Sequence, residues 1–330
     1  MALVDYVVHC FFGCILVLYT FHFLLRTLLQ TMTNSLTYGQ RYVISTKIVS
    51  GVFALVTSVI AARTLVSTTD IMHQPDTVLE TYTILMCGYF AYDIIVMYRG
   101  FVEKLRDAKK LNNRNMKQLV KAFLRRELFI VIHHAVLQCL GLPVAVVMLT
   151  RRGLGVFFMA GVFIAEISTP FYSTRGILTT IGKTSGVFYE VNGLCFMITF
   201  FFGRICSFPY LYYRYSIYAN LPLYRVPFKI PLLCNVASFA FFALQSYWFY
   251  LIIRTVFNYL LKSKSAQELK VEGNHADDRK VTNGHAVNGN GHVISKGNHV
   301  VNGDGLVVNG NCHVINGNGH VIDSESKKTH

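Results

Sequence analysis

The chain has 330 residues, of which 53% are hydrophobic and only 15% are charged, whereas a soluble domain carries roughly 25% charged residues. This composition excludes an ordinary soluble enzyme and indicates a membrane protein. The net charge of +14 does not indicate nucleic-acid binding, because the Lys and Arg residues lie mainly between apolar stretches, where they orient a membrane protein. The eight cysteines lie almost all in apolar stretches without CxxC spacing, so we expect neither a metal site nor a disulfide framework.

Seven apolar stretches are each long enough to cross about 30 Å of hydrocarbon as a helix. The predicted fold class is therefore all-α, a polytopic membrane protein with about seven transmembrane helices. The first stretch starts with Asp5 instead of basic residues, so we interpret it as a retained span and not as a cleaved signal peptide. The predicted spans are 4–29, 42–66, 78–98, 127–149, 154–174, 188–208 and 232–261.

The loop at 99–126 decides the predicted orientation. It holds ten Lys and Arg residues against two acidic ones, Glu103 and Asp107. The positive-inside rule assigns this loop to the cytosol. Seven spans then place the N-terminus in the lumen and the C-terminus in the cytosol.

The C-terminal segment repeats itself. From Thr282 a seven-residue unit recurs six times, from TNGHAVN to GNGHVID. The recurring Asn-Gly opposes a helix, and the adjacent apolar pair does not match a coiled coil. Two alternatives are that the histidines of the repeats bind a metal weakly and that the repeats stack as a small β-solenoid. We interpret 262–330 as a disordered cytosolic tail of low complexity.

A few ionisable and polar side chains lie inside the predicted spans, where each ionisable group costs on the order of 3 kcal/mol. At about 1.5 Å of rise per residue, His133 and His134 lie roughly 10 Å from the cytosolic end and Asp93 roughly 8 Å from it. Glu166 lies at a similar depth, and Asn192 enters from the same side. We expect one polar layer in which an imidazole acts as base or nucleophile and carboxylates fix its tautomer. The alternative is that these groups bond to one another and fix helix packing.

Two further cations in the spans have simpler interpretations. Arg204 is expected toward the lumenal end of the sixth span, where it snorkels or pairs, and Lys47 lies near a span end, where snorkelling suffices.

Four segments of the sequence resemble the TLC-domain family, which is named for translocation-associated membrane proteins, ceramide synthases and a ceroid-lipofuscinosis protein. They are IVIHHAVL, FIAEISTPF, YEVNGLCFMITFF and VPFKIPLLCNVASFAF, and they are most similar to the branch called TLC domain-containing protein 3. The resemblance implies a TLC domain over 42–261, with six of the helices around a cytosol-facing cavity, in the endoplasmic reticulum. Residues 1–41, the first span and a cytosolic linker, and the tail at 262–330 lie outside it.

The resemblance also implies chemistry. Ceramide synthases of this family transfer an acyl group from acyl-CoA to the amine of a sphingoid base, and their signature begins with a histidine pair that His133 and His134 match. Where the signature carries two aspartates in the next span, this sequence has Glu166, Ser168 and Thr169. His133 and His134 are therefore the predicted catalytic residues, and the polar layer adds Asp93 and Glu166, either of which would orient the imidazole. The implied substrate-binding residues are Asn192, Ser168, Thr169, Arg125 and Arg126, the arginines facing the CoA phosphates.

These inferences give three functional hypotheses. The first is a ceramide synthase-like N-acyltransferase of membrane lipid metabolism, with no bound cofactor, acyl-CoA as co-substrate, and membrane lipids and a sphingoid base as partners. The second is a non-catalytic lipid-binding protein or regulator of membrane lipid homeostasis. The third is a proton-coupled transporter built on the intramembrane ionisable groups. All three hypotheses are compatible with a homo-oligomer or a hetero-oligomer, and none involves binding of nucleic acid.

Overall fold

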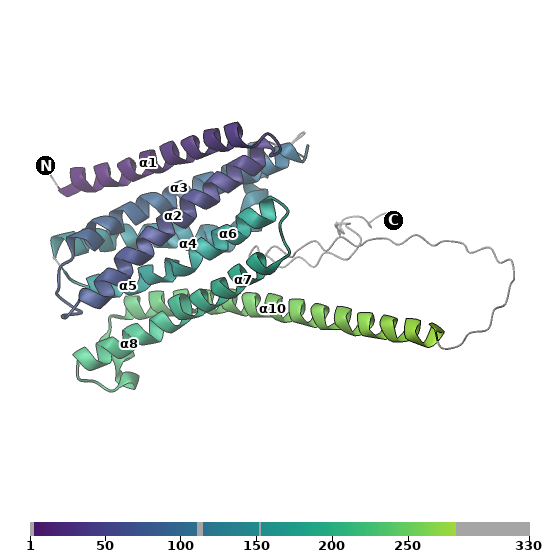
Figure 1. Cartoon of the computed structure of the whole chain (residues 1–330). Coiled ribbons are helices and arrows are strands. Elements are labelled where there is room, and N and C mark those ends of the chain that lie inside the picture. Colours follow the sequence, from purple (N-terminus) through teal and green to yellow (C-terminus); the bar gives the residue numbers. More distant parts are fainter. Residues whose placement is uncertain (1–2, 111–114, 152, 282–330) are drawn as a thin grey trace, which may run out of the picture.

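The computed structural model describes residues 3–110, 115–151 and 153–281, with the side chains of its last helix described up to residue 259. The six repeats predicted from Thr282 therefore lie outside the described residues. Figure 1 shows a bundle of long helices in which the last helix, α10, extends beyond one end.

The described residues contain seven helical spans that are long and apolar enough to cross a membrane. This confirms the prediction of an all-α polytopic membrane protein. The first four spans are single helices, and the next two are interrupted. The spans are Leu3–Met32 (α1), Tyr38–Ser67 (α2), Thr77–Asp107 (α3), Met116–Thr150 (α4), Val156–Thr180, Val187–Tyr218 and Leu232–Tyr259.

The fifth and sixth spans each change helix type inside the bundle. The fifth consists of α5 (Val156–Phe163), the 3-10 helix η1 (Ile164–Ser168) and α6 (Thr169–Thr180). The sixth consists of α7 (Val187–Phe200), the π-helix η2 (Phe201–Cys206) and α8 (Ser207–Tyr218). The short elements η3 (Leu223–Arg225) and α9 (Val226–Lys229) lead to α10 (Leu232–Val281), which continues well past the predicted end of the seventh span at residue 261.

Helix α4 begins earlier than predicted and bends. A capping box formed by Asn115 and Gln118 starts it, since each side chain accepts a hydrogen bond from the other residue's backbone N–H. At Glu127 the backbone is non-helical, with φ −113° and ψ 19°. A basic segment at 116–126 therefore precedes the apolar part of the helix, which starts where the span was predicted.

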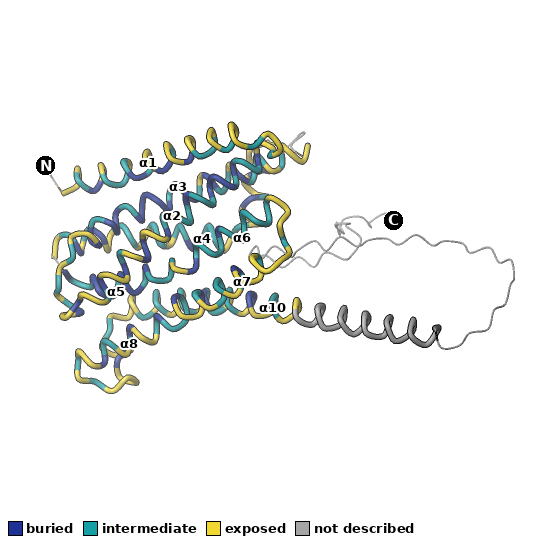
Figure 2. The backbone as a smooth tube through the Cα atoms, viewed as in Figure 1, coloured by how far each residue is buried: buried dark blue, intermediate teal, exposed yellow. Residues whose placement is uncertain are grey.

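Helix α3 lies at the centre of the bundle. In the most apolar stretch of α3, 56% of the residues are buried inside the protein. In the corresponding stretches of the other six spans, 11–39% of the residues are buried. Figure 2 shows buried positions gathered along α3 and the facing sides of its neighbours. The outer faces carry exposed large apolar side chains such as Val59 and Phe239, which is the pattern expected for helices surrounded by lipid.

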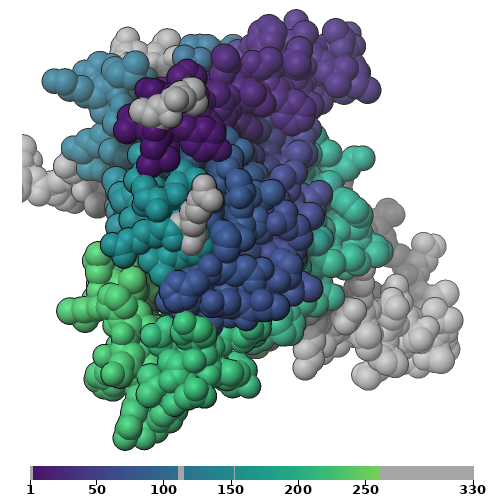
Figure 3. All heavy atoms as spheres, turned by 90° about the vertical axis from the view of Figure 1, so that its left-hand side faces the viewer, coloured from purple at the N-terminus to yellow at the C-terminus, as the bar shows by residue number. Residues whose placement is uncertain are grey.

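Helix α1 packs against α2 and α3 through a buried polar group. The His22 side chain is 4% exposed. Its Nδ1 atom forms a hydrogen bond of 3.1 Å with the Tyr92 hydroxyl, and its Nε2 atom forms one of 3.3 Å with the Ser45 hydroxyl. Its ring also contacts that of Tyr42, with 4.6 Å between centroids. Figure 3 shows α1 at the top of the end view and the α8 to α10 region at the bottom.

The turn between α4 and α5 gives a stability prediction. Gly153 has φ +85°, and a Cβ atom there would lie 2.6 Å from the His73 carbonyl oxygen and 2.6 Å from the Pro75 nitrogen. Gly155 has φ +78° but open space around it. The left-handed conformation costs an L-residue about 1–2 kcal/mol, and overpacking adds about 1–3 kcal/mol.

Gly153→Ala is therefore expected to lower the melting temperature of the detergent-solubilised protein clearly more than Gly155→Ala does. The second variant carries the backbone strain without the clash, so equal effects would contradict the described turn.

Asp76, in the loop before α3, gives a prediction for pH. Its carboxylate accepts hydrogen bonds from the Val78 and Leu79 amides and from Thr64 Oγ1, and it lies 2.6 Å from Arg63 Nη2. Burial alone would raise the pKa of Asp76, but these hydrogen bonds and the arginine charge outweigh it and hold the pKa below its ordinary value.

Because the folded pKa is depressed, this stabilisation is present above the unfolded pKa and is lost as pH falls through the folded one. Asp76→Asn is therefore expected to destabilise the protein at neutral pH and to reduce the loss of stability between about pH 5 and pH 3. Thermal unfolding in detergent over this range measures both effects. An unchanged acid response in the variant would contradict this role of Asp76.

Candidate functional site

The fifth span changes from α to 3-10 geometry because of Pro170, which has no N–H to donate to the carbonyl of Glu166. The Thr169 N–H bonds to that carbonyl instead. In a 3-10 helix the side chains at i and i+3 eclipse, so Glu166 and Thr169 lie side by side. The Thr169 hydroxyl donates to Glu166 Oε2 at 2.6 Å. Local sequence thus places a carboxylate and a hydroxyl on one edge of the span.

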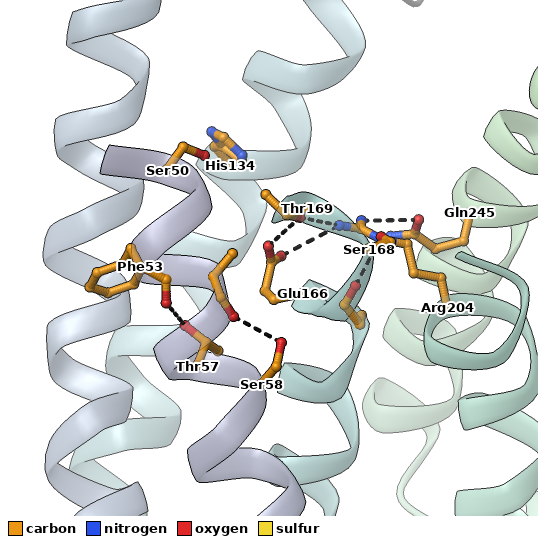
Figure 4. Close-up of polar contacts among 12 residues, drawn as sticks. Ser50, Phe53, Thr57, Ser58, His134, Glu166, Ser168, Thr169, Arg204 and Gln245 are labelled. Carbon is orange, nitrogen blue, oxygen red and sulfur yellow. Dashed lines mark hydrogen bonds and ion pairs between the residues drawn. The ribbon is translucent and has the colours of Figure 1, made fainter. Parts of the chain in front are cut away.

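Arg204, in the π-helix η2, completes this group. Its Nε donates to Ser168 Oγ at 2.9 Å and its Nη2 to Thr169 Oγ1 at 3.0 Å, and its Nη2 lies 3.7 Å from Glu166 Oε1. A longer contact of 3.4 Å joins Nη1 to Gln245 Oε1 on α10. We call Glu166, Ser168, Thr169, Arg204 and Gln245 the arginine cluster, and Figure 4 shows its members joined across three spans.

Gly203 allows the two irregular turns to approach. A Cβ atom there would lie 2.7 Å from Ile167 Cγ2 and 3.1 Å from the Ile164 carbonyl oxygen. Because η1 and η2 pack this closely, Arg204 points inward to the cluster. The sequence alone predicts Arg204 toward the lumenal end of its span, apart from Glu166. The signal in the sequence was a lone cation and a lone carboxylate in neighbouring apolar spans.

A second group lies between α3 and α4. His134 Nδ1 is 3.2 Å from Asp93 Oδ2, with side-chain exposures of 13% and 9%. The atoms are close, but the geometry does not reach that of a hydrogen bond. Such contacts often tighten when a ligand binds. The contact with Nδ1 leaves the opposite ring nitrogen, Nε2, turned away from the carboxylate. We call His133, His134 and Asp93 the histidine cluster.

His133 has different surroundings from its neighbour. It is 8% exposed and packs edge-on against Trp248 and Phe241 of α10, with 5.3 Å and 5.7 Å between ring centroids. Its buried Nδ1 atom has no hydrogen-bond partner among the described residues. Adjacent helical residues point about 100° apart, which is why one histidine faces α3 and the other faces α10.

The two clusters lie within electrostatic reach of each other. The charges of Asp93, Glu166 and Arg204 all act on the His134 imidazole. Figure 4 places His134 on the side of Ser50 and the arginine cluster on the side of α10. Asp93 is the carboxylate in contact with a histidine, whereas Glu166 is engaged by Thr169 and Arg204. The hydroxyls of Ser168 and Thr169 are likewise bonded to Arg204.

The remaining predicted residues lie elsewhere. Asn192 donates to the Phe171 carbonyl at 3.0 Å and so joins α7 to α6. Arg126 pairs with Glu127 at 3.2 Å. Arg125 lines an open groove of about 540 Å³ on the basic segment of α4, with Met116, Lys117, Val120, Lys121, Leu124 and Leu128. Within the described residues, no three His, Cys, Asp or Glu side chains gather as metal ligands would.

Comparison with known proteins shows where the chain belongs. The sequence model of the TLC domain matches residues 43–254, which include every predicted site residue. No solved structure matches the chain. The TLC domain indicates a function related to membrane lipids, and the match over most of the chain shows that this protein belongs to the TLC-domain family.

Proposed function

We propose that the protein is a ceramide synthase-like N-acyltransferase that moves an acyl group from acyl-CoA to the amine of a sphingoid base. The observation that carries this proposal is the buried contact between Asp93 and His134 Nδ1. A carboxylate on one ring nitrogen favours the tautomer whose other nitrogen is a free base. An apolar span has little structural reason to hold this pair, because each ionisable group there is costly.

In the proposed reaction His134 acts as the general base. Its Nε2 atom accepts a proton from the amine as the nitrogen attacks the thioester carbonyl carbon. The C–N bond forms, the C–S bond breaks, and the proton passes to the departing CoA thiolate. Asp93 stabilises the imidazolium between these steps. The buried His133 ring, with an unpartnered Nδ1 atom, is suited to hold a polar group of the substrate.

Two finer parts of the proposal, the branch and the location, rest on the sequence resemblance, and the orientation rests on the positive-inside rule. The branch is TLC domain-containing protein 3, the location is the endoplasmic reticulum, and the basic loop and the C-terminus face the cytosol. In this orientation Arg125 and the lysines of the α4 groove lie where the phosphates of acyl-CoA would approach.

One observation favours the second candidate, a non-catalytic protein of membrane lipid homeostasis. Glu166 is paired with Arg204, and Ser168 and Thr169 also bond to that arginine. The positions that match the family's aspartate pair therefore bring no second carboxylate to the histidines.

Mass spectrometry of lipid products decides between the two candidates. Purified protein is incubated in detergent with a sphingoid base and acyl-CoA. Acyl-CoA-dependent ceramide supports the transferase. Well-folded protein that yields no ceramide, yet co-purifies with lipid, supports the regulator and overturns the transferase.

A further inference from the structure

The basic segment at the start of α4 is held against α3 by one side. Phe123 is buried there and packs against Tyr98 and Phe101 of α3, with 5.4 Å and 5.8 Å between ring centroids. The Tyr98 hydroxyl also donates to the Met116 sulfur at 2.8 Å. The capping box at Asn115 fixes the first turn. The segment is therefore anchored through one side and exposed on the other.

Two rows of side chains run along the exposed side of this segment and line an open groove of about 540 Å³. One row is apolar and the other is basic. Each row repeats every four residues, so its successive side chains are neighbours on the helix surface. Among the described residues, none with an acidic side chain lines the groove. The apolar row is Met116, Val120, Leu124 and Leu128, and the basic row is Lys117, Lys121 and Arg125.

The apolar row does not end with the groove. Its next two positions, Ile132 and Val136, belong to the apolar part of α4 and are exposed, as Val120 and Leu124 are. The row therefore leads from the basic edge at the start of α4 into the part of the helix that crosses hydrocarbon. A ligand that fits this continuous surface has an anionic head and a long apolar chain.

An anionic phospholipid has both parts. Its phosphate accepts charge-assisted hydrogen bonds from Lys and Arg, and in the orientation proposed above the groove lies in the cytosolic leaflet, where anionic lipids are concentrated. Acyl-CoA also has phosphates and a chain, but its thioester must reach His134, which faces α3 beside Asp93. A donor that approached over the basic row would leave the exposed apolar row unfilled, so this row indicates a further ligand.

We propose that the groove binds an anionic phospholipid of the surrounding membrane, with its phosphate on Lys117, Lys121 and Arg125 and one acyl chain along the apolar row. The site goes beyond the proposed acyl transfer and does not depend on it. The bound lipid fixes the basic segment at the membrane surface, next to the bend at Glu127.

Native mass spectrometry of the purified full-length chain in detergent tests the site. The probes are palmitoyl-oleoyl phosphatidylglycerol and phosphatidylcholine with the same chains. Wild type is expected to bind phosphatidylglycerol about tenfold more tightly or better. Lys117→Gln combined with Lys121→Gln is expected to lower this preference at least about fivefold. Equal binding of the two lipids by wild type, or an unchanged preference in the variant, would overturn the site.

A matched control separates a site from general charge. Lys109→Gln combined with Lys110→Gln also removes two exposed lysines, from the loop before α4 and outside the groove. It is expected to change the preference by less than about twofold. A loss as large as that of the groove variant would show that the preference reflects net charge, and the site would be rejected.

A third variant tests the apolar row. Val120→Ser combined with Leu124→Ser keeps every charge and is expected to weaken phosphatidylglycerol binding about fivefold or more. CoA is the competing probe. If CoA binding depends on Lys117 and Lys121 while phosphatidylglycerol binding ignores the apolar row, the groove belongs to the acyl donor and the lipid proposal fails.

His134→Ala distinguishes this inference from the proposed reaction, because the variant should form no ceramide and keep the preference for phosphatidylglycerol. A lysine-dependent preference in a wild type that forms no ceramide would leave the lipid site standing and remove the transferase. Ceramide formation by a wild type that binds both lipids equally would do the reverse.

Discussion

Replacing His134 by alanine is expected to slow ceramide formation by roughly 10²- to 10⁴-fold, the usual contribution of a general base. Asp93 lies 3.2 Å from its Nδ1 atom, so the variant loses the imidazole that acts as the base in the proposed reaction. The effect should fall on kcat with little change in KM, because the proton transfer occurs in the transition state. Initial rates by mass spectrometry at varied sphingoid base give both constants.

Asp93→Asn and His133→Ala are the matched comparisons. Asp93→Asn keeps the size of the side chain but removes the charge, so it should produce a smaller loss of kcat. His133 packs against Trp248 and Phe241, and its loss should act mainly on KM. If His134→Ala forms ceramide at the wild-type rate, His134 is not the general base of the reaction.

Arg204→Met is expected to lower the free energy of unfolding by about 3–5 kcal/mol, the typical cost of removing one partner of a buried ion pair. Glu166 would then remain at 16% side-chain exposure without its cation, and Ser168 would lose a donor. The double variant Glu166→Gln, Arg204→Met removes both charges and should recover a large part of the loss. Thermal unfolding of the single and double variants in detergent measures this coupling.

Arg214 supplies the control, since it lies in the same span, hydrogen-bonds to the Tyr210 hydroxyl and lies over the Phe157 ring. Arg214→Met removes an arginine that has no carboxylate partner among the described residues, so its effect should be much smaller. Strictly additive losses in the Glu166 and Arg204 variants would show that the two side chains are not energetically coupled.

The number of spans and most of their limits follow from sequence because a helix in lipid must be long and apolar. The depth argument also places Asp93 and His134 at one level, where the structure brings them into contact. Pairing across interrupted helices is different. The fifth span continues to Thr180, six residues past its predicted end, and Pro170 shifts part of it into 3-10 geometry, so counting residues from the predicted span ends placed Glu166 and Arg204 at different depths. The length of α10 was missed because its continuation past the apolar span is polar and carries no hydrophobic signal.

The His22 contacts bear on where this protein can be cut. The family match starts at residue 43, after the whole of α1, although His22 bonds to Ser45 and Tyr92 inside the matched region. A fragment trimmed to residues 43–254 would lose His22, the hydrogen-bond partner that the Ser45 and Tyr92 hydroxyls share. These hydroxyls would then face hydrocarbon, where an unsatisfied polar group costs several kcal/mol. We therefore expect a fragment that keeps α1 to be more stable in lipid than one trimmed to residues 43–254.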